Sequence, residues 1–209
     1  MKISLIGMSG TGKSHWAKKL EKNGFLRICC DDLIEEKLGE ELKVFGYSGI
    51  KDVAKWMGQP YNKQYPITSK KYLSLEKKIM EEIINNLKND FYKNKNIVID
   101  TTGSVIYTGK RILQSLSELT KIIYLDVCDS LIKEMHKLYL RDPKPVIWGN
   151  IFKKKANETN KQALTNCYPK LLEYRAKKYK LFAKKTLDYF SLRKPNITSE
   201  KFLKLISKT

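Results

Sequence analysis

Apolar residues recur along this chain with two different spacings. Five short, nearly continuous apolar runs predict buried β-strands, and these runs are Lys2–Ile6, Phe25–Cys30, Asn96–Asp100, Lys121–Val127 and Thr186–Leu192. Between them, apolar residues recur every three or four positions, which predicts amphipathic helices. Strands that alternate with helices favour a parallel sheet covered on both faces. The chain is therefore predicted to be an α/β three-layer sandwich with a five-stranded parallel sheet.

The helical spacing also gives the predicted bounds of the helices. They are Lys13–Lys22, Asp31–Gly39, Gly49–Gly58, Thr68–Asp90, Thr108–Leu119, Asp129–Leu140, Thr159–Lys185 and Thr198–Lys208. Gly39 is expected to end its helix, and Thr68 is expected to cap the long helix that follows. The stretch Glu40–Ser48 between them is predicted to be irregular.

The segment Arg141–Gly149, RDPKPVIWG, fits no regular element. Its two prolines break a helix, and residues 146–148 form an apolar tip. We therefore predict that about residues 141–158 form a lid over a cleft. Trp148 either seals the closed site or is exposed on a loop. Residues 33–94 lie between the second and third strands, where a substrate-binding insertion is expected. No internal repeat or linker divides the chain, so residues 1–209 are predicted to form a single domain.

Composition narrows the class of protein. Hydrophobic residues make up 42% of the chain, which supports a substantial core, and no apolar run approaches the roughly 18 residues that cross a bilayer. We therefore expect a cytoplasmic, soluble monomer with no membrane partner. Four irregularly spaced cysteines are too few for a disulfide framework and make no CxxC metal pair.

The net charge of +19 raises a nucleic-acid alternative. Only five of the 41 basic residues are arginine, and the lysines are spread along the predicted helices. A surface for a phosphate backbone usually favours clustered arginine with interleaved aromatic residues. Nucleic acid is thus an alternative partner but not the favoured one, and the positive field would attract any anion, ATP included.

The strongest motif lies between the first strand and the first helix. Residues 7–14 read GMSGTGKS, which matches the Walker A pattern GxxxxGK followed by Ser or Thr. In such a loop, glycines let backbone N–H groups turn inward around phosphates, Lys13 reaches the β and γ phosphates, and the Ser14 hydroxyl binds Mg²⁺. The predicted cofactors are ATP and Mg²⁺, and the predicted nucleotide-binding residues of the loop are Gly7, Ser9, Gly10, Thr11, Gly12, Lys13 and Ser14.

Carboxylates end two of the predicted strands. Asp31 and Asp32 follow the second strand, and Asp100 is the last residue of the third. Ligands of open parallel sheets bind at the carboxyl ends of the strands, which favours a functional role for Asp31 or Asp32. Asp100 is predicted to hold Mg²⁺ through water. The structural alternatives are a helix cap for the first pair and a simple strand end for Asp100.

The chain resembles the shikimate kinase family in four features. These are the phosphate loop, the segment DDLIEEKLG, the lid and the long helix near the end of the chain. Asp31, Ile34, Glu35 and Gly39 reproduce the offsets of that family's DxD-like strand end and the IE and Gly that follow. The resemblance implies a P-loop NTPase fold. It also implies that Asp31 binds the substrate hydroxyl and acts as the base.

Later segments carry the resemblance to the end of the chain. Residues 72–76, YLSLE, resemble the family's FRxxE-type helix, and residues 101–103, TTG, resemble its Gly-rich loop. In the lid, residues 144–148, KPVIW, resemble the RPL segment. Residues 168–179, YPKLLEYRAKKY, resemble the YxxLLxxRxxxY helix. The substrate-binding residues that the resemblance implies are Asp31, Glu76, Gly103, Lys144 and Arg175. Arg193-Lys194-Pro195 resembles the RxP segment that flanks adenine, so Arg193 and Pro195 are expected to bind nucleotide.

The resemblance fails at the substrate pocket. Cys29 replaces the first Asp of the DxD-like motif, Leu73 replaces an Arg that grips the substrate carboxylate, and Thr101-Thr102 replace two glycines. Lys144 stands at the Arg of the lid segment. An apolar leucine cannot replace a bidentate arginine, so the substrate is expected to be something other than shikimate.

These observations predict an ATP-dependent phosphotransferase that moves the γ-phosphate to a hydroxyl of a small molecule. The catalytic residues are expected to be Lys13, Asp31 and, from the lid, Arg141. Arg175 is expected to hold the substrate, with a solvated surface position as its alternative. The alternative functions are a polynucleotide or nucleoside kinase and a nucleotide-binding regulatory protein.

Overall fold

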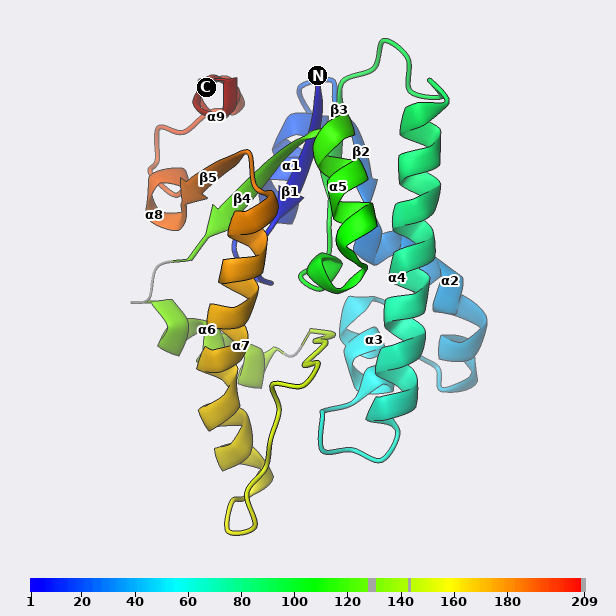
Figure 1. The fold of residues 1–209 in the computed structure, drawn as a ribbon, viewed down its shortest axis with the longest axis vertical. Coiled ribbons are helices and arrows are strands. Elements are labelled where there is room, and N and C mark those ends of the chain that lie inside the picture. The colour runs from blue at the N-terminus through cyan, green and yellow to red at the C-terminus, as the bar shows by residue number, and fades with distance from the viewer. Residues whose placement is uncertain (128–130, 143, 208–209) are drawn as a thin grey trace.

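Five parallel strands form the centre of the molecule. The computed structural model describes residues 1–127, 131–142 and 144–207. Its strands are β1 (Lys2–Ile6), β2 (Leu26–Cys29), β3 (Ile97–Asp100), β4 (Lys121–Asp126) and β5 (Lys185–Asp188). They pair in the order β2-β3-β1-β4-β5, and each pair is parallel (Figure 1). The predicted five-stranded parallel sheet is confirmed.

Helices cover both faces of this sheet (Figure 1). They are α1 (Lys13–Glu21), α2 (Cys30–Val44), α3 (Ile50–Met57), α4 (Tyr65–Lys88), the 3₁₀ turn η1 (Val105–Tyr107), α5 (Lys110–Leu119), α6 (Ile132–Arg141), α7 (Asn160–Phe182), α8 (Tyr189–Leu192) and α9 (Ser199–Ser207). Of the predicted helix Asp129–Leu140, positions 129 and 130 lie outside the described residues. None of the helices in the described ranges is apolar over enough of its length to span a bilayer.

Alternate strand residues build two separate cores. Ile3 and Leu5 of β1 pack with α1 and α9 on one face, whereas Ile97 and Ile99 of β3 pack with α4, α5 and α7 on the other. Since neighbouring residues of a strand point to opposite faces, the central strands need apolar residues at nearly every position. This requirement explains the continuous apolar runs, and the two cores confirm the three-layer sandwich.

The second helix is longer than its sequence predicts. Gly39 does not end it, and α2 continues to Val44 through much of the stretch predicted to be irregular. Leu38 and Leu42 are both buried and extend one apolar stripe along the helix. Their burial outweighs the cost of about 1 kcal/mol for a glycine inside a helix.

Two other predicted bounds are wrong for local reasons. The long helix α4 begins at Tyr65, with proline in its first turn, and the Thr68 hydroxyl donates to the Met57 carbonyl at 2.7 Å instead of capping the helix. The fifth strand stops at Asp188, whose carboxylate accepts a hydrogen bond from the backbone N–H of Ser191 at 2.9 Å. That bond caps the short helix α8.

The apolar residues of the predicted lid are anchored in the core. Val146, Ile147 and Trp148 are buried, which excludes the alternative that Trp148 is exposed on a loop. The Tyr65 hydroxyl donates to the Val146 carbonyl at 2.9 Å and accepts from the Trp148 N–H at 2.8 Å. The segment after α6 is thereby tied to α4.

The last helix, α9, is held to the first by an aromatic pair. The rings of Trp16 and Phe202 stack with centroids 4.4 Å apart, and Phe202 is fully buried.

Replacing Phe202 with alanine is expected to lower the free energy of unfolding by about 3–5 kcal/mol, measured by urea denaturation. The half-exposed Phe190 provides the control. Phe190→Ala should change the free energy of unfolding by no more than about 0.5 kcal/mol. Equal effects of the two substitutions would contradict this packing.

Candidate functional site

The loop between β1 and α1 forms a tight backbone turn at the carboxyl end of the sheet. Gly7, Gly10 and Gly12 all have positive φ angles, of 144°, 85° and 98°. A Cβ atom on Gly7 would lie 2.8 Å from the Leu125 carbonyl oxygen of β4, so a side chain is excluded there. The Thr11 hydroxyl donates to the Met8 carbonyl at 2.9 Å and closes the turn.

Lys13 begins α1 and is nearly buried. Its ammonium donates to the carbonyl oxygens of Gly7 at 2.8 Å and Met8 at 3.0 Å. Burial lowers the pKa of this ammonium, while the carboxylates of Asp100 and Asp31 oppose that change. The charge is therefore held at the mouth of the loop by two backbone carbonyls, whose place a phosphate can take.

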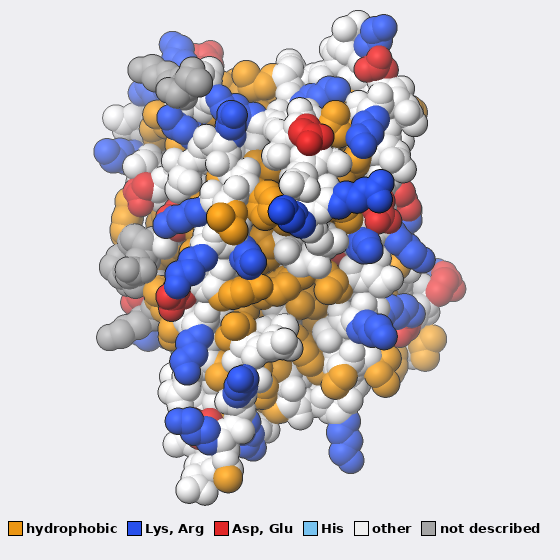
Figure 2. All heavy atoms as spheres, viewed as in Figure 1, with side chains coloured by type: hydrophobic (Ala, Val, Ile, Leu, Met, Phe, Trp, Pro, Cys, Tyr) orange, Lys and Arg blue, Asp and Glu red, His pale blue; other side chains and the backbone are white. Residues whose placement is uncertain are grey.

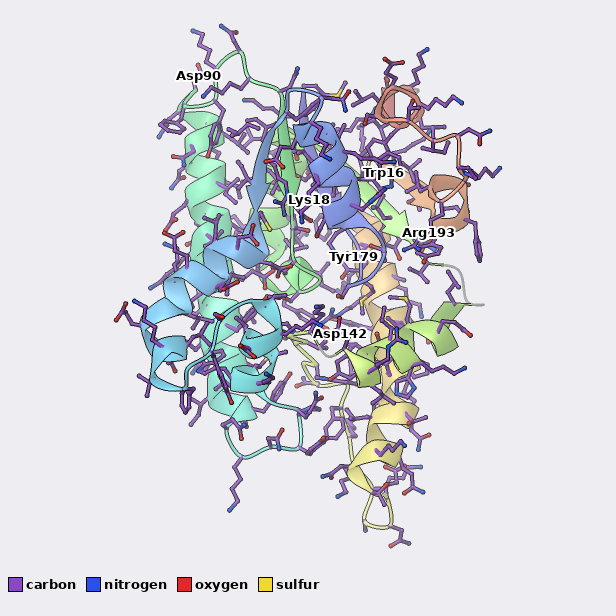
Figure 3. The ribbon with its side chains drawn as sticks, turned by 180° about the vertical axis from the view of Figure 1, so that it is seen from behind. Trp16, Lys18, Asp90, Asp142, Tyr179 and Arg193 are labelled. Carbon is purple, nitrogen blue, oxygen red and sulfur yellow. The ribbon has the colours of Figure 1, made fainter. Side chains whose placement is uncertain are left out.

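A cavity of about 420 Å³ opens beside this loop. It is lined by residues of the loop and the start of α1, including Ser9, Gly10, Gly12, Lys13 and Ser14. It is also lined by residues of α2, α3, α4, α6 and α7 and of the segments after β3 and α6, among them Asp31, Tyr72, Gly103, Lys144 and Arg175. In the reverse view of Figure 3, Asp142 and Tyr179 mark this end of the sheet, below α1.

Asp31 stands in the first turn of α2, directly after β2. It is half-buried and lines the cavity, and its Oδ1 accepts a hydrogen bond from the Tyr72 hydroxyl at 3.4 Å. Burial raises the pKa of this carboxyl to about 6, opposed by the Lys13 ammonium and reinforced by Asp100. Asp32 lies outside the cavity with its side chain 69% exposed. The sequence does not decide whether Asp31 or Asp32 has the functional role. In the structure, Asp31 lines the cavity and Asp32 does not.

Asp100 is buried behind the cavity and is not among its lining residues. Its carboxylate accepts from the Arg27 guanidinium at 3.2 Å. Mg²⁺ usually takes one or two carboxylates and completes its shell with phosphates and water. The Ser14 hydroxyl supplies an oxygen for such an ion at the cavity surface, whereas the Asp100 carboxylate is buried and paired with Arg27. Arg27 is not among the predicted site residues, although an arginine within an apolar strand is itself a signal of a buried ion pair.

Glu76 is fully buried and is also absent from the cavity lining. It accepts hydrogen bonds from the hydroxyls of Thr102 and Ser104, the latter at 2.6 Å. Burial raises its carboxyl pKa to about 7, while the two hydroxyls oppose that rise. Thr102 lines the cavity in its place, so Glu76 reaches the site only through Thr102.

Arg175 of α7 is only 2% exposed, which rules out its alternative of a solvated surface position. Its Nη1 donates to the Gly103 carbonyl at 3.0 Å and its Nη2 to the Ile147 carbonyl at 2.7 Å. A Cβ atom on Gly103 would lie 3.2 Å from Nη1, so this close approach favours glycine. Arg175 therefore fastens the loop after β3 and the segment after α6 to one helix.

The remaining predicted residues are more exposed. Lys144 lines the cavity, but Arg141 is exposed at the end of α6 and is not among the lining residues. Arg193 and Pro195 are exposed, and the Arg193 guanidinium lies 4.3 Å from the centre of the Tyr189 ring. Partial burial and the charges of Lys19 and Arg193 lower the pKa of His15, which places Arg193 near the start of α1.

Two aromatic residues line the cavity but are not among the site residues predicted from the sequence. Tyr139 of α6 and Tyr168 of α7 both line it, and their rings stack at 5.2 Å with an interplanar angle of 19°. Each belongs to the apolar stripe of its helix, where periodicity cannot separate a core residue from a cavity residue. A tyrosine within such a stripe is the only signal that could have pointed to them.

Comparison with known proteins supports the fold. No protein-family model matches the sequence, and no curated protein does. Among solved structures, the chain is similar to shikimate kinase from Acinetobacter baumannii in complex with shikimate, with 18% identity, a TM-score of 0.57, and 96% of this chain and 87% of that chain covered. Shikimate kinase from Bacteroides thetaiotaomicron covers 99% of this chain and 94% of its own, at 17% identity and a TM-score of 0.49. The likeness to the Acinetobacter baumannii structure shows that this chain has the α/β fold of a shikimate kinase.

Proposed function

We propose that this protein is an ATP-dependent phosphotransferase that moves the γ-phosphate of ATP to a hydroxyl group of a small molecule. The observation that carries the proposal is that Lys13 and Asp31 line the same cavity and that their charges interact. A phosphate-binding loop alone supports nucleotide binding. A carboxylate facing the loop with a pKa of about 6 adds a group suited to accept a proton near neutral pH.

The proposed roles follow from the positions of the side chains. Lys13 and the loop N–H groups hold the β and γ phosphates, and the Ser14 hydroxyl would help to hold Mg²⁺, to which Asp100 would be linked through water. Mg²⁺, when bound, neutralises charge on the phosphates. The acceptor hydroxyl oxygen bonds to the γ-phosphorus, the bond to the bridging oxygen breaks to release ADP, and the hydroxyl proton passes to Asp31.

Other predicted residues take supporting roles in this proposal. Arg175 fixes the cavity wall through its two backbone carbonyl partners, and Glu76 positions Thr102. Arg193 and Pro195 flank the adenine ring on the exposed side of α1. Arg141 contributes only if its side chain turns from solvent towards the phosphates, because it is exposed in this structure.

The nucleic-acid alternative draws less support. On the face drawn in Figure 2, lysine and arginine side chains are scattered among apolar and polar ones and do not gather in one stripe. Steep loss of transfer to an oligonucleotide between low and physiological salt would favour this alternative.

The direct test is transfer of labelled phosphate. The full chain is incubated with ATP labelled at the γ position, Mg²⁺ and single acceptors drawn from hydroxy acids, sugars, nucleosides and oligonucleotides, and the products are identified by mass spectrometry. The proposal expects label on a small alcohol. Label only in free phosphate, with every acceptor, would contradict it.

Activity is expected to depend on pH through Asp31. The carboxyl pKa is raised from its ordinary value to about 6, so Asp31 is deprotonated and able to accept a proton above that pH and is protonated below it. We expect kcat/KM to fall about tenfold per pH unit below about 6, and to be flat from about 7 to 8. Circular dichroism across the same range serves as the control for folding. A profile that stays flat down to about pH 5 would contradict the assignment of Asp31.

A further inference from the structure

Asp31 receives a hydrogen bond from a tyrosine on a different helix. Tyr72 lies on α4 and is only 1% exposed, and its hydroxyl donates to Oδ1 of Asp31 at 3.4 Å. Both residues line the cavity beside the phosphate loop. Because α2 and α4 pack against each other, the contact ties the carboxyl group of Asp31 to the core of the protein.

The packing of α4 does not require this hydroxyl. Tyr72 belongs to the buried stripe of α4, together with Ile79 and Ile83, where a phenylalanine ring would fill the same place. Burial raises the pKa of the Tyr72 hydroxyl well above its ordinary value, and the carboxylates of Asp31 and Glu76 add to the rise. The hydroxyl therefore keeps its proton and faces Asp31 as a hydrogen-bond donor. A buried hydroxyl costs free energy unless it is bonded, so its use lies in this contact.

Several groups act on the charge of Asp31. Burial raises the pKa of its carboxyl most, whereas the Lys13 ammonium and the hydrogen bond from Tyr72 oppose that rise. Burial also raises the pKa of the neighbouring Cys30 thiol, which is therefore neutral. The titratable groups that interact with Asp31 are Lys13 of α1, Cys30 and Asp32 of α2, Tyr72 and Glu76 of α4, and Asp100 of β3.

We propose that Tyr72 is a positioning residue for Asp31, whose hydroxyl holds Oδ1 and so reserves Oδ2 for the proton of the acceptor hydroxyl. A carboxyl group turns readily about its last side-chain bond, and a fixed donor on one oxygen sets the direction of the other. Lys13 is proposed to turn to the phosphates of ATP, whereas Tyr72 stays in the core and keeps its contact with Asp31 during transfer. The inference rests on the proposed function, because it takes Asp31 to be the proton acceptor.

Titration of the Asp31 carboxyl tests the contact without an acceptor. The full chain is labelled with carbon-13 in its aspartate carboxyl groups, and the NMR signal of Asp31 is identified by its absence from Asp31→Asn. Tyr72→Phe keeps the ring and removes only the hydroxyl. We expect it to raise the pKa of Asp31 by about one unit, because a hydrogen bond that favours the ionised form is lost.

The matched control is a second buried tyrosine. Tyr92 is 8% exposed and is not among the residues that line the cavity, so Tyr92→Phe should leave the pKa of Asp31 unchanged. An unchanged pKa of Asp31 in Tyr72→Phe, or equal rises in the two variants, would overturn the inference.

Kinetics separates positioning from a structural role. With the best acceptor of the screen, the acid limb of kcat/KM in Tyr72→Phe should move upward by the same amount as the titrated carboxyl, because Asp31 is protonated below its raised pKa. At about pH 8, where Asp31 is largely ionised in both proteins, kcat should still be about tenfold lower, with unchanged affinity for ATP. An acid limb that does not follow the carboxyl, or a wild-type kcat at this pH, would overturn the positioning role.

A second variant keeps the hydroxyl and makes it a stronger donor. In Tyr72→3-fluorotyrosine, incorporated at this position alone, the pKa of Asp31 should fall below that of the wild type, so the inference is testable even where Tyr72→Phe does not fold. An unchanged or raised pKa would overturn it. The proposed function fails separately, when no acceptor in the screen receives labelled phosphate, and the carboxyl titration then still decides whether Tyr72 controls Asp31.

Discussion

Replacing Lys13 with alanine is expected to lower kcat/KM for phosphate transfer from ATP by at least about 10²–10³-fold. The ammonium is held at the mouth of the phosphate loop by two backbone carbonyls, from which it can turn to the γ-phosphate as negative charge develops there. Steady-state kinetics with the best acceptor of the screen measures the loss. Calorimetry with ATP and Mg²⁺ should show weaker nucleotide binding in the same variant.

The control for this substitution lies on the same helix. Lys18 is exposed on α1 (Figure 3), and Lys18→Ala removes an equal charge away from the cavity. It should change kcat/KM by less than about twofold, because an exposed charge interacts weakly through solvent. Loss of activity in both variants would point to the net charge, and not to the loop, as the cause.

Asp31→Asn is expected to lower kcat by about 10²–10⁴-fold while the affinity for ATP stays nearly constant. The amide keeps the size of the side chain but cannot take the proton of the acceptor hydroxyl. Asp31→Asn should therefore lower kcat alone, whereas Lys13→Ala is expected to lower both kcat and the affinity for ATP. Single-turnover kinetics at about pH 7.5 separates the chemical step from binding.

The neighbouring aspartate provides a matched control. Asp32 has a 69% exposed side chain and lies 3.8 Å from Arg27, outside the cavity. Asp32→Asn should retain kcat within about threefold, because it removes only an exposed ion pair. A larger loss from Asp32→Asn than from Asp31→Asn would reverse the proposed assignment of the base.

The sequence predicts much of the fold because its strongest signals are local. Apolar runs such as residues 121–127 cannot be exposed, and the glycines of residues 7–12 permit backbone angles that other residues resist. The phosphate loop, the parallel sheet and the start of α7 follow from such signals. Thr159, where the predicted helix begins, caps α7 in the structure through a full capping box with Gln162.

The errors arise where tertiary packing overrides a local signal. Gly39 and Thr68 both carry helix-end signals, yet each lies inside a helix that buries an apolar stripe on both sides of it. Trp148 follows two prolines in a charged segment, but Tyr65 binds that segment and draws it into the core. Nothing near residue 148 in the sequence points to residue 65.

The chemistry of the acceptor site depends on contacts between distant segments. The pairing of Lys51 with Asp142 joins α3 to the residue after α6, and the two carbonyl partners of Arg175 lie in different segments again. Residue types alone give charges without their partners. They do not predict that Lys144 pairs with Asp142 or that Arg175 donates to two backbone carbonyls.

One measurement tests the central claim that a single cavity holds both the phosphate donor and the proton acceptor. Transfer of labelled γ-phosphate to the best acceptor of the screen is followed side by side in the wild-type chain, Lys13→Ala and Asp31→Asn. The account predicts a labelled alcohol with the wild type and almost none with either variant, while Asp31→Asn still binds ATP. Wild-type rates of transfer in both variants, or no transfer to any alcohol by the wild type, would contradict it.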